Sequence, residues 1–425
     1  MKVLLLGSGG REHAIAWSFV KSPKLEELFV VPGNAGIAEI ATCVDIKLND
    51  FSAIKDFCDK EKIDLVMVGP EQPLADGITE YLEKENIKIV GCNSFCAQLE
   101  SSKAFTKQIC DKAGIKTAGY EVFTDSESAI DYLHEQKKFP QVIKADGLAA
   151  GKGVIIAENR TKAVKAVQDI FSGAYGEMDK IVIEEFLTGV EASFFAISDG
   201  NDFKVLSSAG DHKRIGDNDT GPNTGGMGTY SPSPFVTDEV RQEVIEDILK
   251  STFNYLKEQG HPYKGIIFAG LMINEQNEPY LIEYNIRFGD PETQSILSRL
   301  ESDFLEICYA AAVGKLAEQE VKFSDKKAIT LVLSAKGYPG NYKKGNEIKL
   351  DKLKDIEGIN IFHAGTKQEG EKLLSNGGRV LNITAVGSDF NEAFDKVYEA
   401  AKAVKWKDKY YRKDIGAALF KRHAA

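Results

Sequence analysis

Residues 144–156 read KADGLAAGKGVII, a glycine-rich stretch of the kind that holds phosphate groups. The Walker A pattern requires two glycines separated by four residues, then Lys and Ser or Thr, and its loop runs into a helix. Here Gly147 and Gly151 are separated by three residues. Gly153 follows Lys152, and the VIIAE sequence after it is typical of a strand. The stretch therefore predicts the tip of a β-hairpin, a movable flap over phosphates, and not a Walker A loop.

Length and composition indicate an ordinary globular protein of several domains. The chain has 425 residues, which at about 100–200 residues per domain corresponds to roughly two to four domains. Hydrophobic residues make up 43% and charged residues 28% of the chain, as in typical folded proteins. The formal net charge of −11 argues against nucleic acid or an anionic membrane surface as a partner, because both require a basic face.

Cysteine usage and the lack of long apolar runs predict a cytoplasmic protein. The six cysteines are scattered along the chain, which is typical of reduced thiols. Cys92 and Cys96 are spaced like half of a metal site, but no second pair of ligands accompanies them. The apolar run at the N-terminus is too short for a signal peptide, and no run of about 18 apolar residues predicts a membrane span.

Residues 1–102 alternate short apolar segments with helical segments. The apolar segments are KVLLLG (2–7), LFVVPG (28–33), DLVMVGP (64–70) and IKIVGC (87–92). Nearly continuous apolar strands separated by helices predict an open parallel sheet with helices on both faces. Ligands bind such sheets beyond the carboxyl ends of the strands. At three of these ends lie Gly9 and Gly10, Asn34, and Glu71.

The first of these turns, GSGGREH (7–13), departs from the dinucleotide-binding fingerprint. G-x-G-x-x-G requires a glycine where Glu12 stands, and the acidic residue expected about 20 residues later is absent. A glycine-rich turn at a helix N-terminus still favours an anion, because free N–H groups and the helix dipole point toward it. A phosphorylated small molecule fits better than NAD, and a tight turn without a ligand is the alternative.

Residues 207–234 have almost no apolar residues and no periodicity. Loops of this length inside a compact protein are usually functional or disordered. This segment contains Asp211 and Lys213 and is rich in turn residues without low-complexity repetition. We interpret it as a long binding loop, with a mobile surface loop as the alternative.

The stretch PYLIEYNIRFGDPE (279–292) predicts a strand with one polar and one apolar face. Alternation places Glu283, Asn285 and Arg287 on the polar face. The face expected to pack carries Ile282, Tyr284, Ile286 and Phe288. A carboxylate and an amide oxygen two residues apart suit Mg²⁺, and a guanidinium suits the phosphates bound to it. The alternative is an exposed edge strand with ordinary polar residues.

Three features occur in order along the chain. They are the glycine-rich hairpin with Lys152, the acidic-apolar strand IVIEEFL (181–187), and the E-x-N strand that leads to Arg287. This combination resembles the ATP-grasp superfamily, in which ATP lies between two α+β subdomains and a carboxylate is activated as an acyl phosphate. The motifs GSGGREHA, PGNAG, GPEQPL, DHKRIGDNDTGPNTGGMG, RFGDPE and NGGRVL resemble one member family, the phosphoribosylamine–glycine ligases (glycinamide ribonucleotide synthetases), over nearly the whole chain.

The resemblance implies an α/β and α+β multidomain fold. An N-terminal open parallel sheet (1–102) precedes an ATP-grasp domain (103–325), whose flap subdomain covers about 120–190, and a small C-terminal α+β domain (326–425) follows. The implied cofactors are ATP and Mg²⁺, with Mn²⁺ as an alternative, in a monomeric enzyme. The implied reaction joins glycine to 5-phosphoribosylamine through a glycyl phosphate and gives glycinamide ribonucleotide, ADP and phosphate, a step of purine (IMP) synthesis.

The resemblance also implies residue roles. The ATP site would consist of Lys103, Lys144, Gly147, Gly151, Lys152, Gly153, Glu184, Glu185, Phe186, Leu187 and Glu191. Within it, the two lysines Lys103 and Lys144 would contact phosphates, residues 184–187 would hold adenine through backbone groups, and Glu191 would accept from the ribose. The metal would be bound by Glu283 and Asn285.

Catalysis and substrate binding are expected on the remaining polar residues. Arg287, Asp211 and Lys213 are the candidate catalytic residues. The candidates for 5-phosphoribosylamine and its surroundings are Gly9, Gly10, Asn34, Glu71, Asp290 and Pro291. His13 and His212 are either proton shuttles or structural residues. Two other functions stay open: an ATP-grasp ligase with a different acid or amine, and a nucleotide sensor without catalysis.

Overall fold

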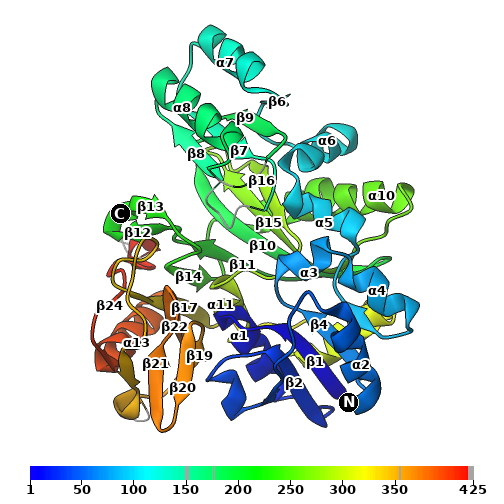
Figure 1. Cartoon of the computed structure of the whole chain (residues 1–425), viewed down its shortest axis with the longest axis vertical. Helices are drawn as coiled ribbons and strands as arrows, with labels where there is room; N and C mark the ends of the chain where they lie inside the picture. Colours follow the sequence, from blue (N-terminus) through cyan, green and yellow to red (C-terminus); the bar gives the residue numbers. More distant parts are fainter. Residues whose placement is uncertain (149–152, 175, 177, 354–355, 420–425) are drawn as a thin grey trace.

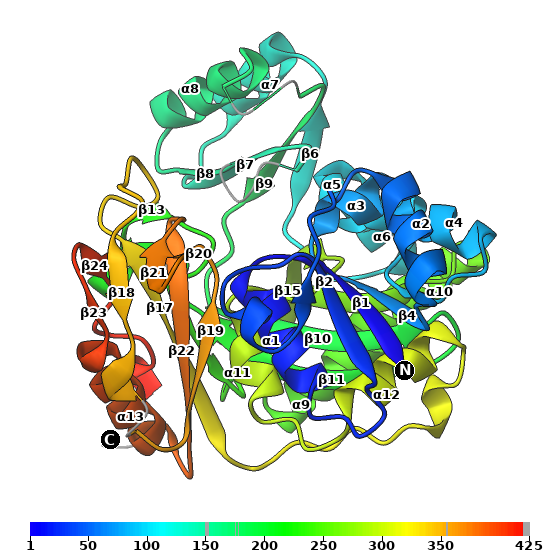
Figure 2. The same cartoon turned by 60° about the horizontal axis from the view of Figure 1, so that its bottom comes forward.

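The computed structural model describes residues 1–148, 153–174, 176, 178–353 and 356–419. A small lobe formed by residues 120–185 projects from a broad body in both views (Figures 1 and 2). The body is formed by the N-terminal, central and C-terminal segments. None of the helices in these described ranges has the length and apolar character needed to cross a membrane.

The N-terminal segment forms the predicted parallel sheet. Its strands are β1 (Lys2–Gly7), β2 (Glu27–Pro32), β3 (Thr42–Cys43), β4 (Leu65–Val68) and β5 (Ile89–Val90), in the order β3-β2-β1-β4-β5. Its helices are α1 (Gly10–Phe19), α2 (Phe51–Glu61), α3 (Glu71–Ala75), α4 (Ile78–Lys84) and α5 (Ser94–Ser101). Leu6 of β1 pairs with Val31 of β2 and Val68 of β4, so the turns after these strands share one edge of the sheet.

The small lobe is an antiparallel sheet with two helices. Its strands are β6 (Tyr120–Phe123), β7 (Gln141–Ala145), β8 (Val154–Ala157) and β9 (Ile181–Glu185), in the order β6-β9-β7-β8, and its helices are α7 (Ser126–Glu135) and α8 (Arg160–Phe171). β7 and β8 are antiparallel partners, with Lys144 opposite Val154. The predicted hairpin is therefore confirmed, whereas Gly151 and Lys152 at its tip lie outside the described residues.

One large sheet runs through the centre and the C-terminal part of the body. Its strands, in spatial order, are β16 (Pro279–Asn285), β15 (Lys264–Ile273), β10 (Val190–Asp199), β11 (Phe203–Asp211), β14 (Gly228–Ser231), β17 (Lys327–Ala335), β22 (Arg379–Gly387) and β19 (Ile359–His363), and β24 (Lys409–Tyr410) pairs with β17. The C-terminal segment is α+β as expected, but its strands continue the central sheet through the β14–β17 pair. The domain boundaries at 103 and 326 stay predictions.

The remaining elements are short strands and helices around this sheet. The short strands are β12 (Arg214–Gly216), β13 (Thr220–Asn223), β18 (Glu347–Lys349), β20 (Thr366–Glu369), β21 (Lys372–Ser375) and β23 (Lys405–Trp406). The helices are α6 (Lys103–Ala113), α9 (Asp238–Glu243), a π-helix (Val244–Lys250), α10 (Ser251–Glu258), α11 (Glu292–Leu297), α12 (Phe304–Ala312) and α13 (Phe390–Ala403).

The prediction of a continuous loop over residues 207–234 is wrong. The segment contains the end of β11, the β12–β13 hairpin and β14. β14 and the end of β11 lack apolar alternation because their buried faces are polar: the Ser231 hydroxyl donates to the Ser208 carbonyl at 2.7 Å. β12 and β13 contain no buried residue. Arg299 also donates to the Ser231 hydroxyl, at 3.0 Å. Buried hydroxyls with partners of this kind occupy positions where a sequence pattern expects apolar residues.

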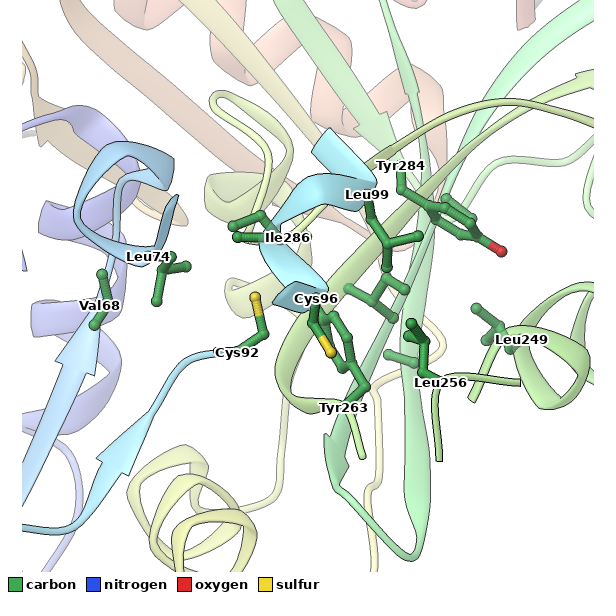
Figure 3. Packing of buried hydrophobic residues seen from close by; sticks show 14 of the residues in the cluster. Val68, Leu74, Cys92, Cys96, Leu99, Leu249, Leu256, Tyr263, Tyr284 and Ile286 are labelled. Carbon is green, nitrogen blue, oxygen red and sulfur yellow. The ribbon is translucent and has the colours of Figure 1, made fainter. Parts of the chain in front are cut away.

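A hydrophobic cluster joins the N-terminal sheet to the strand that carries the predicted metal ligands. Cys96 and Leu99 on α5 lie next to Tyr263 and Leu256, and Ile286 reaches the same cluster from the end of β16 (Figure 3). These side chains are at most 2% exposed. Side chains packed this closely cannot move independently of one another. The cluster therefore fixes the backbone on either side of Ile286 relative to α5.

Candidate functional site

A small cavity of about 10 Å³ lies among β10, β11, β15 and β16. A volume of this size is about that needed for one water molecule. Its polar lining consists of Glu191, Ser193, Asp211, Lys213 and Glu283. The fold thus brings together residues that were expected in three roles: the ribose acceptor, the catalytic pair and a metal ligand.

The side of the cavity formed by β10 and β11 carries opposite charges. The Lys213 ammonium lies 2.9 Å from the Glu191 carboxylate, which raises the pKa of Lys213. Asp211 Oδ1 is buried without a hydrogen-bond partner among the described residues. Burial, and then the nearby Glu292 carboxyl, raise the pKa of Asp211 well above its usual range. A buried acceptor without a partner is costly, which indicates a group that binds a ligand donor.

Glu283 and Asn285 have the environment expected of metal ligands. No hydrogen bond or ion pair within the described part of the chain engages either side-chain oxygen. Burial by itself would raise the pKa of Glu283, but Lys213, Lys144 and other nearby cations outweigh it and hold the pKa below its ordinary value. Glu283 is therefore ionised at neutral pH, and the pair offers the hard oxygen donors that Mg²⁺ prefers.

The prediction that Ile282 packs on the apolar face is wrong. Gly270 of β15 is opposite Glu283, whereas Leu271 is opposite Leu281, so Ile282 has no partner on β15 and forms a β-bulge. The bulge turns Ile282 toward the cavity, which it lines together with Leu271. Bulges of this kind redirect side chains next to functional sites.

The two lysines expected at the ATP phosphates both lie beside the hairpin. Lys103, the first residue of α6, donates to the carbonyl of Gly147 at 2.8 Å. Lys144 on β7 lies 2.9 Å from the Glu184 carboxylate and donates to the Ile282 carbonyl at 3.2 Å. The small lobe and the large sheet are therefore bridged by an ammonium group next to Glu283.

The expected adenine-binding segment connects the two sheets. β9 ends at Glu185 and β10 begins at Val190, so residues 186–189 form the connection. Glu185 makes two hydrogen bonds of 2.9 Å with Gly119, which lies between α6 and β6. Its backbone N–H donates to the Gly119 carbonyl, and its carboxylate accepts the Gly119 N–H. Phe186 is 39% exposed, and its role stays a prediction. Leu187, whose role stays a prediction, is partly buried.

Arg287 is held by two carboxylates. Its Nε donates to Glu71 at 3.2 Å and its Nη2 donates to Glu100 at 2.7 Å. Burial would lower the pKa of Arg287, but these carboxylates raise it instead. A guanidinium has five N–H donors, so this arrangement fixes the group and leaves donors for a ligand. The structure thus joins the expected catalytic Arg287 to Glu71, which was expected to bind substrate.

The turn after β1 is already capped by its own helix. The Gly9 N–H donates to the Glu12 carboxylate at 2.6 Å, so this amide has a partner within the chain. A Cβ on Gly10 would lie 2.1 Å from the Asn382 amide nitrogen of the C-terminal segment, so a larger residue there would have to displace the Asn382 side chain. Asn34 donates to the carbonyls of Ser8 and His363 at 2.8 Å. The structure therefore shows Asn34 as a residue that organises this turn.

Asp290 and Pro291 lie close to the same turn. A Cβ on Gly9 would lie 3.3 Å from the Asp290 carboxylate. Asp290 forms an ion pair with Arg379 at 3.3 Å. The C-terminal segment therefore contributes a partly buried cation, Arg379, to the group of expected substrate residues. Pro291 is joined to Asp290 by a cis peptide bond.

The geometry at His13 favours a structural role, whereas His212 Nδ1 is buried without a hydrogen-bond partner among the described residues and its role stays open. His13 Nδ1 accepts the backbone N–H of His363 at 2.8 Å. Burial, and secondly His363, lower the pKa of His13 to about 3. Burial likewise lowers the pKa of His212 to about 4. Both rings are neutral at physiological pH, and His13 is already engaged between two segments.

Sequence reasoning missed three charged residues of the site. Glu100 holds Arg287, Lys107 lies 3.2 Å from Glu184, and Arg379 pairs with Asp290. Arg379 belongs to the NGGRVL motif, which contributed to the family resemblance but did not indicate a role for Arg379. Glu100 and Lys107 flank the Ser-capped start of α6, and no motif marked them.

The chain matches three family models in succession. They are the N domain (residues 1–100), the ATP-grasp (A) domain (101–293) and the C domain (328–418) of phosphoribosylglycinamide synthetase. It is 48% identical to the phosphoribosylamine–glycine ligase of Rhizobium meliloti over 427 residues, which cover 100% of both chains. It is also 48% identical to the ligase of Escherichia coli O157:H7, with 98% of both chains covered.

Solved structures show the same architecture. The chain resembles the phosphoribosylamine–glycine ligase of Thermotoga maritima with a TM-score of 0.84 and 34% identity, covering 98% of this chain and 100% of that one. It also resembles the biotin carboxylase domain of a Hydrogenobacter thermophilus 2-oxoglutarate carboxylase, solved with MgADP, with a TM-score of 0.74. That domain is 18% identical and covers 96% of this chain and 91% of its own, a likeness of fold alone.

Proposed function

Because the chain belongs to the phosphoribosylglycinamide synthetase family, we propose that the cavity lined by Glu191, Asp211, Lys213 and Glu283 marks where it joins glycine to 5-phosphoribosylamine. The chain is a carbon–nitrogen ligase of purine biosynthesis. Its reaction converts ATP, glycine and 5-phosphoribosylamine to ADP, phosphate and glycinamide ribonucleotide. The observation that carries the placement is the meeting of these four side chains beside Lys144 and Arg287.

The proposed chemistry begins with the glycine carboxylate, a poor electrophile. ATP phosphorylates it, and the amine of 5-phosphoribosylamine then attacks the glycyl phosphate and releases phosphate. Phosphoryl transfer depends on positioning and on neutralising charge, and no covalent enzyme nucleophile is required. Arg287, fixed by Glu71 and Glu100, is suited to hold the acyl phosphate with its remaining donors. Lys213 and Asp211 would orient glycine at the cavity.

ATP-grasp enzymes use ATP with a divalent metal, and we propose Mg²⁺ here, with Mn²⁺ as a substitute. Glu283 and Asn285 would hold the ion, since their oxygens have no partner among the described residues and Glu283 is held ionised. The ion supplies neutralisation of charge on the phosphate oxygens. Lys103 and Lys144 supply further positive charge from the side of the hairpin.

The proposed ATP site continues along the connection between the two sheets. Backbone groups of residues 184–187 would receive adenine, and Glu191 would receive the ribose once ATP replaces its contact with Lys213. The hairpin, with Gly147 and Gly153 in its described part, would close over the phosphates. Gly151 and Lys152, at the tip of the hairpin and outside the described residues, belong to the same proposed phosphate site.

We propose that 5-phosphoribosylamine lies between the turn after β1 and the C-terminal segment. Gly9, Gly10, Asn34, Glu71, Asp290 and Pro291 surround this place together with Arg379. The Gly9 N–H already donates to the Glu12 carboxylate. The negative charge of a phosphate would therefore be neutralised by Arg379 more than by the Gly9 N–H. A cytoplasmic location and a monomeric state are part of the same proposal.

The test is an assay of phosphate release from ATP with the purified protein and a divalent metal. Release is expected only when glycine and 5-phosphoribosylamine are both present, and no release under those conditions would refute the assignment. Replacing glycine by other small acids distinguishes a ligase of different specificity. Arg287→Ala distinguishes the enzyme from a nucleotide sensor without catalysis. The enzyme would lose turnover, whereas the function of a sensor, which is only to bind ATP, would be unchanged.

A further inference from the structure

Three buried charges form a chain at the junction of the small lobe and the large sheet. Lys107 lies 3.2 Å and Lys144 lies 2.9 Å from the two oxygens of the Glu184 carboxylate. The exposed fraction of the side chain is 2% for Lys107, 3% for Lys144 and 4% for Glu184. They come from α6, β7 and β9, which are separate elements of the fold.

Lys144 contacts β16 directly and Lys107 contacts it through Thr117, at the two residues before the expected metal ligand. Lys144 donates to the Ile282 carbonyl at 3.2 Å. Lys107 donates to the Thr117 hydroxyl at 2.7 Å, and Thr117 donates to the Leu281 carbonyl at 2.6 Å. The chain of charges is therefore anchored next to Glu283 at both of its ends.

The contact between Glu184 and Lys144 is electrostatic and not an aligned hydrogen bond. Glu184 Oε1 accepts no hydrogen bond from the described residues although Lys144 Nζ is 2.9 Å away. An ammonium has three N–H donors, and within the described part of the chain only the donor to Ile282 is aligned. Lys144 is thus held in place while donors stay free for phosphate oxygens.

Lys107 keeps Glu184 from binding Lys144 more tightly. With one carboxylate between two ammonium groups, the three charges sum to +1, and Lys144 retains attraction for an anion. Without Lys107, Glu184 and Lys144 would form a neutral buried pair, and ATP would have to break this pair before it gained the lysine. Charge-assisted contacts are the strong ones in such a site, so this competition affects binding.

We propose that Lys107 is a positioning residue for ATP, acting through Glu184 to present Lys144 to the triphosphate. The inference rests on the proposed function only in taking Lys144 as a phosphate contact. It assigns Lys107 no contact with substrate. It also gives the Glu184 side chain a task beyond the backbone contacts proposed for the adenine-binding segment.

The test measures the Kd of a non-hydrolysable ATP analogue with the metal by calorimetry, without glycine or 5-phosphoribosylamine. Lys107→Met is expected to raise the Kd about tenfold. This is the size of the loss of one charge-assisted contact, here the contact between Lys144 and a phosphate oxygen. Adding Glu184→Gln to Lys107→Met should restore the Kd to within about threefold of the original, because it releases Lys144. Lys112→Met, an exposed position on the same helix, is the matched control and should leave the Kd unchanged.

The kinetic readout separates positioning from a loss of structure. In Lys107→Met the KM for ATP should rise about tenfold, while kcat and the KM for glycine stay within about twofold. A Kd within about twofold of the original in Lys107→Met, or a double variant no better than the single one, would overturn the proposal. If Lys107→Met does not fold, Lys107→Gln is measured in the same way and carries the same expectation. Binding is measured without ligation, so a failed ligase assay would leave this result intact.

Discussion

Glu100 holds both the side chain and the backbone around Arg287. Its Oε1 accepts from the Arg287 guanidinium at 2.7 Å, and its Oε2 accepts the backbone N–H of Ile286 at 2.9 Å. Glu100 lies at the end of α5, a helix of the N-terminal segment, and Arg287 follows β16 of the large sheet. Contacts of this kind set the direction of a catalytic group and affect rate more than binding.

Glu100→Gln should therefore lower kcat by about 10- to 100-fold with a change in the Kd for ATP of less than about twofold. The amide keeps the size of the side chain but loses the charge that orients the guanidinium. Steady-state kinetics and equilibrium binding of ATP measure the two effects. Glu258→Gln, at an exposed helix position, is the control. An unchanged kcat in Glu100→Gln would count against this role of Glu100.

Gly226→Ala should disturb the cavity at Asp211. Gly226 has a φ of +110°, and a Cβ there would lie 2.5 Å from Pro291 Cδ and 3.0 Å from Asp211 Oδ1. We expect kcat/KM for glycine to fall about tenfold or more, because a displaced Asp211 no longer orients the substrate. Initial rates at varied glycine concentration measure this.

Gly260→Ala is the matched control, since Gly260 has a φ of +82° with nothing within 4 Å of an added Cβ. Both substitutions should cost about 1 kcal/mol of stability through backbone strain, and Gly226→Ala should cost more because of its contact with Pro291. Only Gly226→Ala should lose activity. Equal kinetics in the two variants would show that the contact with Asp211 has no effect on the site.

Glu283→Gln should weaken metal binding. The carboxylate has no ion-pair partner among the described residues and stays ionised amid nearby cations, so its charge is available to the ion. The Kd of Mn²⁺, followed by its paramagnetic resonance in the presence of ATP, should rise about tenfold or more. Glu275→Gln, exposed in the turn before the same strand, should leave it unchanged. Equal Mn²⁺ affinity in both variants would remove Glu283 from the metal site.

Stability should fall with acidification because His13 is buried as a neutral ring. Its pKa is about 3 in the folded chain, below the value of about 6.5 that an unfolded chain would have. Between these values the unfolded state binds more protons, so the free energy of unfolding decreases as pH falls, by up to about 1.4 kcal/mol per pH unit. Urea unfolding from pH 7 to pH 4 measures the slope.

His13→Gln should reduce that slope, since glutamine does not titrate and still offers an acceptor to the His363 N–H. His363, with a pKa lowered by burial to about 4, contributes a similar dependence and would remain in the variant. A slope that is the same with and without His13 would mean that its ring is not kept neutral in the folded protein.

Local patterns predicted the features that depend on neighbours in sequence. The continuous apolar run Val3–Leu6 is fully buried in the parallel sheet, and the strand signal after Gly153 correctly identified a hairpin. Strand β14 within 207–234 escaped prediction because its Ser231 and Thr229 are buried against partners elsewhere in the chain. A binary pattern cannot supply those partners.

The parts of the site that could not be predicted depend on long-range contacts. Glu100 and Arg287 are 187 positions apart, and Arg379 and Asp290 are 89 positions apart. The bulge at Ile282 arises from the register between two strands, which the alternation of one strand does not reveal. Strand alternation singled out Glu283 and Arg287, and the family resemblance gave them roles that stay predictions, whereas the residues that contact them, such as Glu100, carried no motif.

The central claim is that ATP activates the glycine carboxylate at the site formed by Glu283, Arg287 and the neighbouring lysines. The most direct measurement uses glycine labelled with ¹⁸O in its carboxylate, together with ATP and 5-phosphoribosylamine, and analyses the released phosphate by mass. The account predicts one ¹⁸O in each phosphate, because the oxygen that joins carbon to phosphorus leaves with the phosphoryl group. Phosphate without ¹⁸O, formed along with glycinamide ribonucleotide, would contradict it.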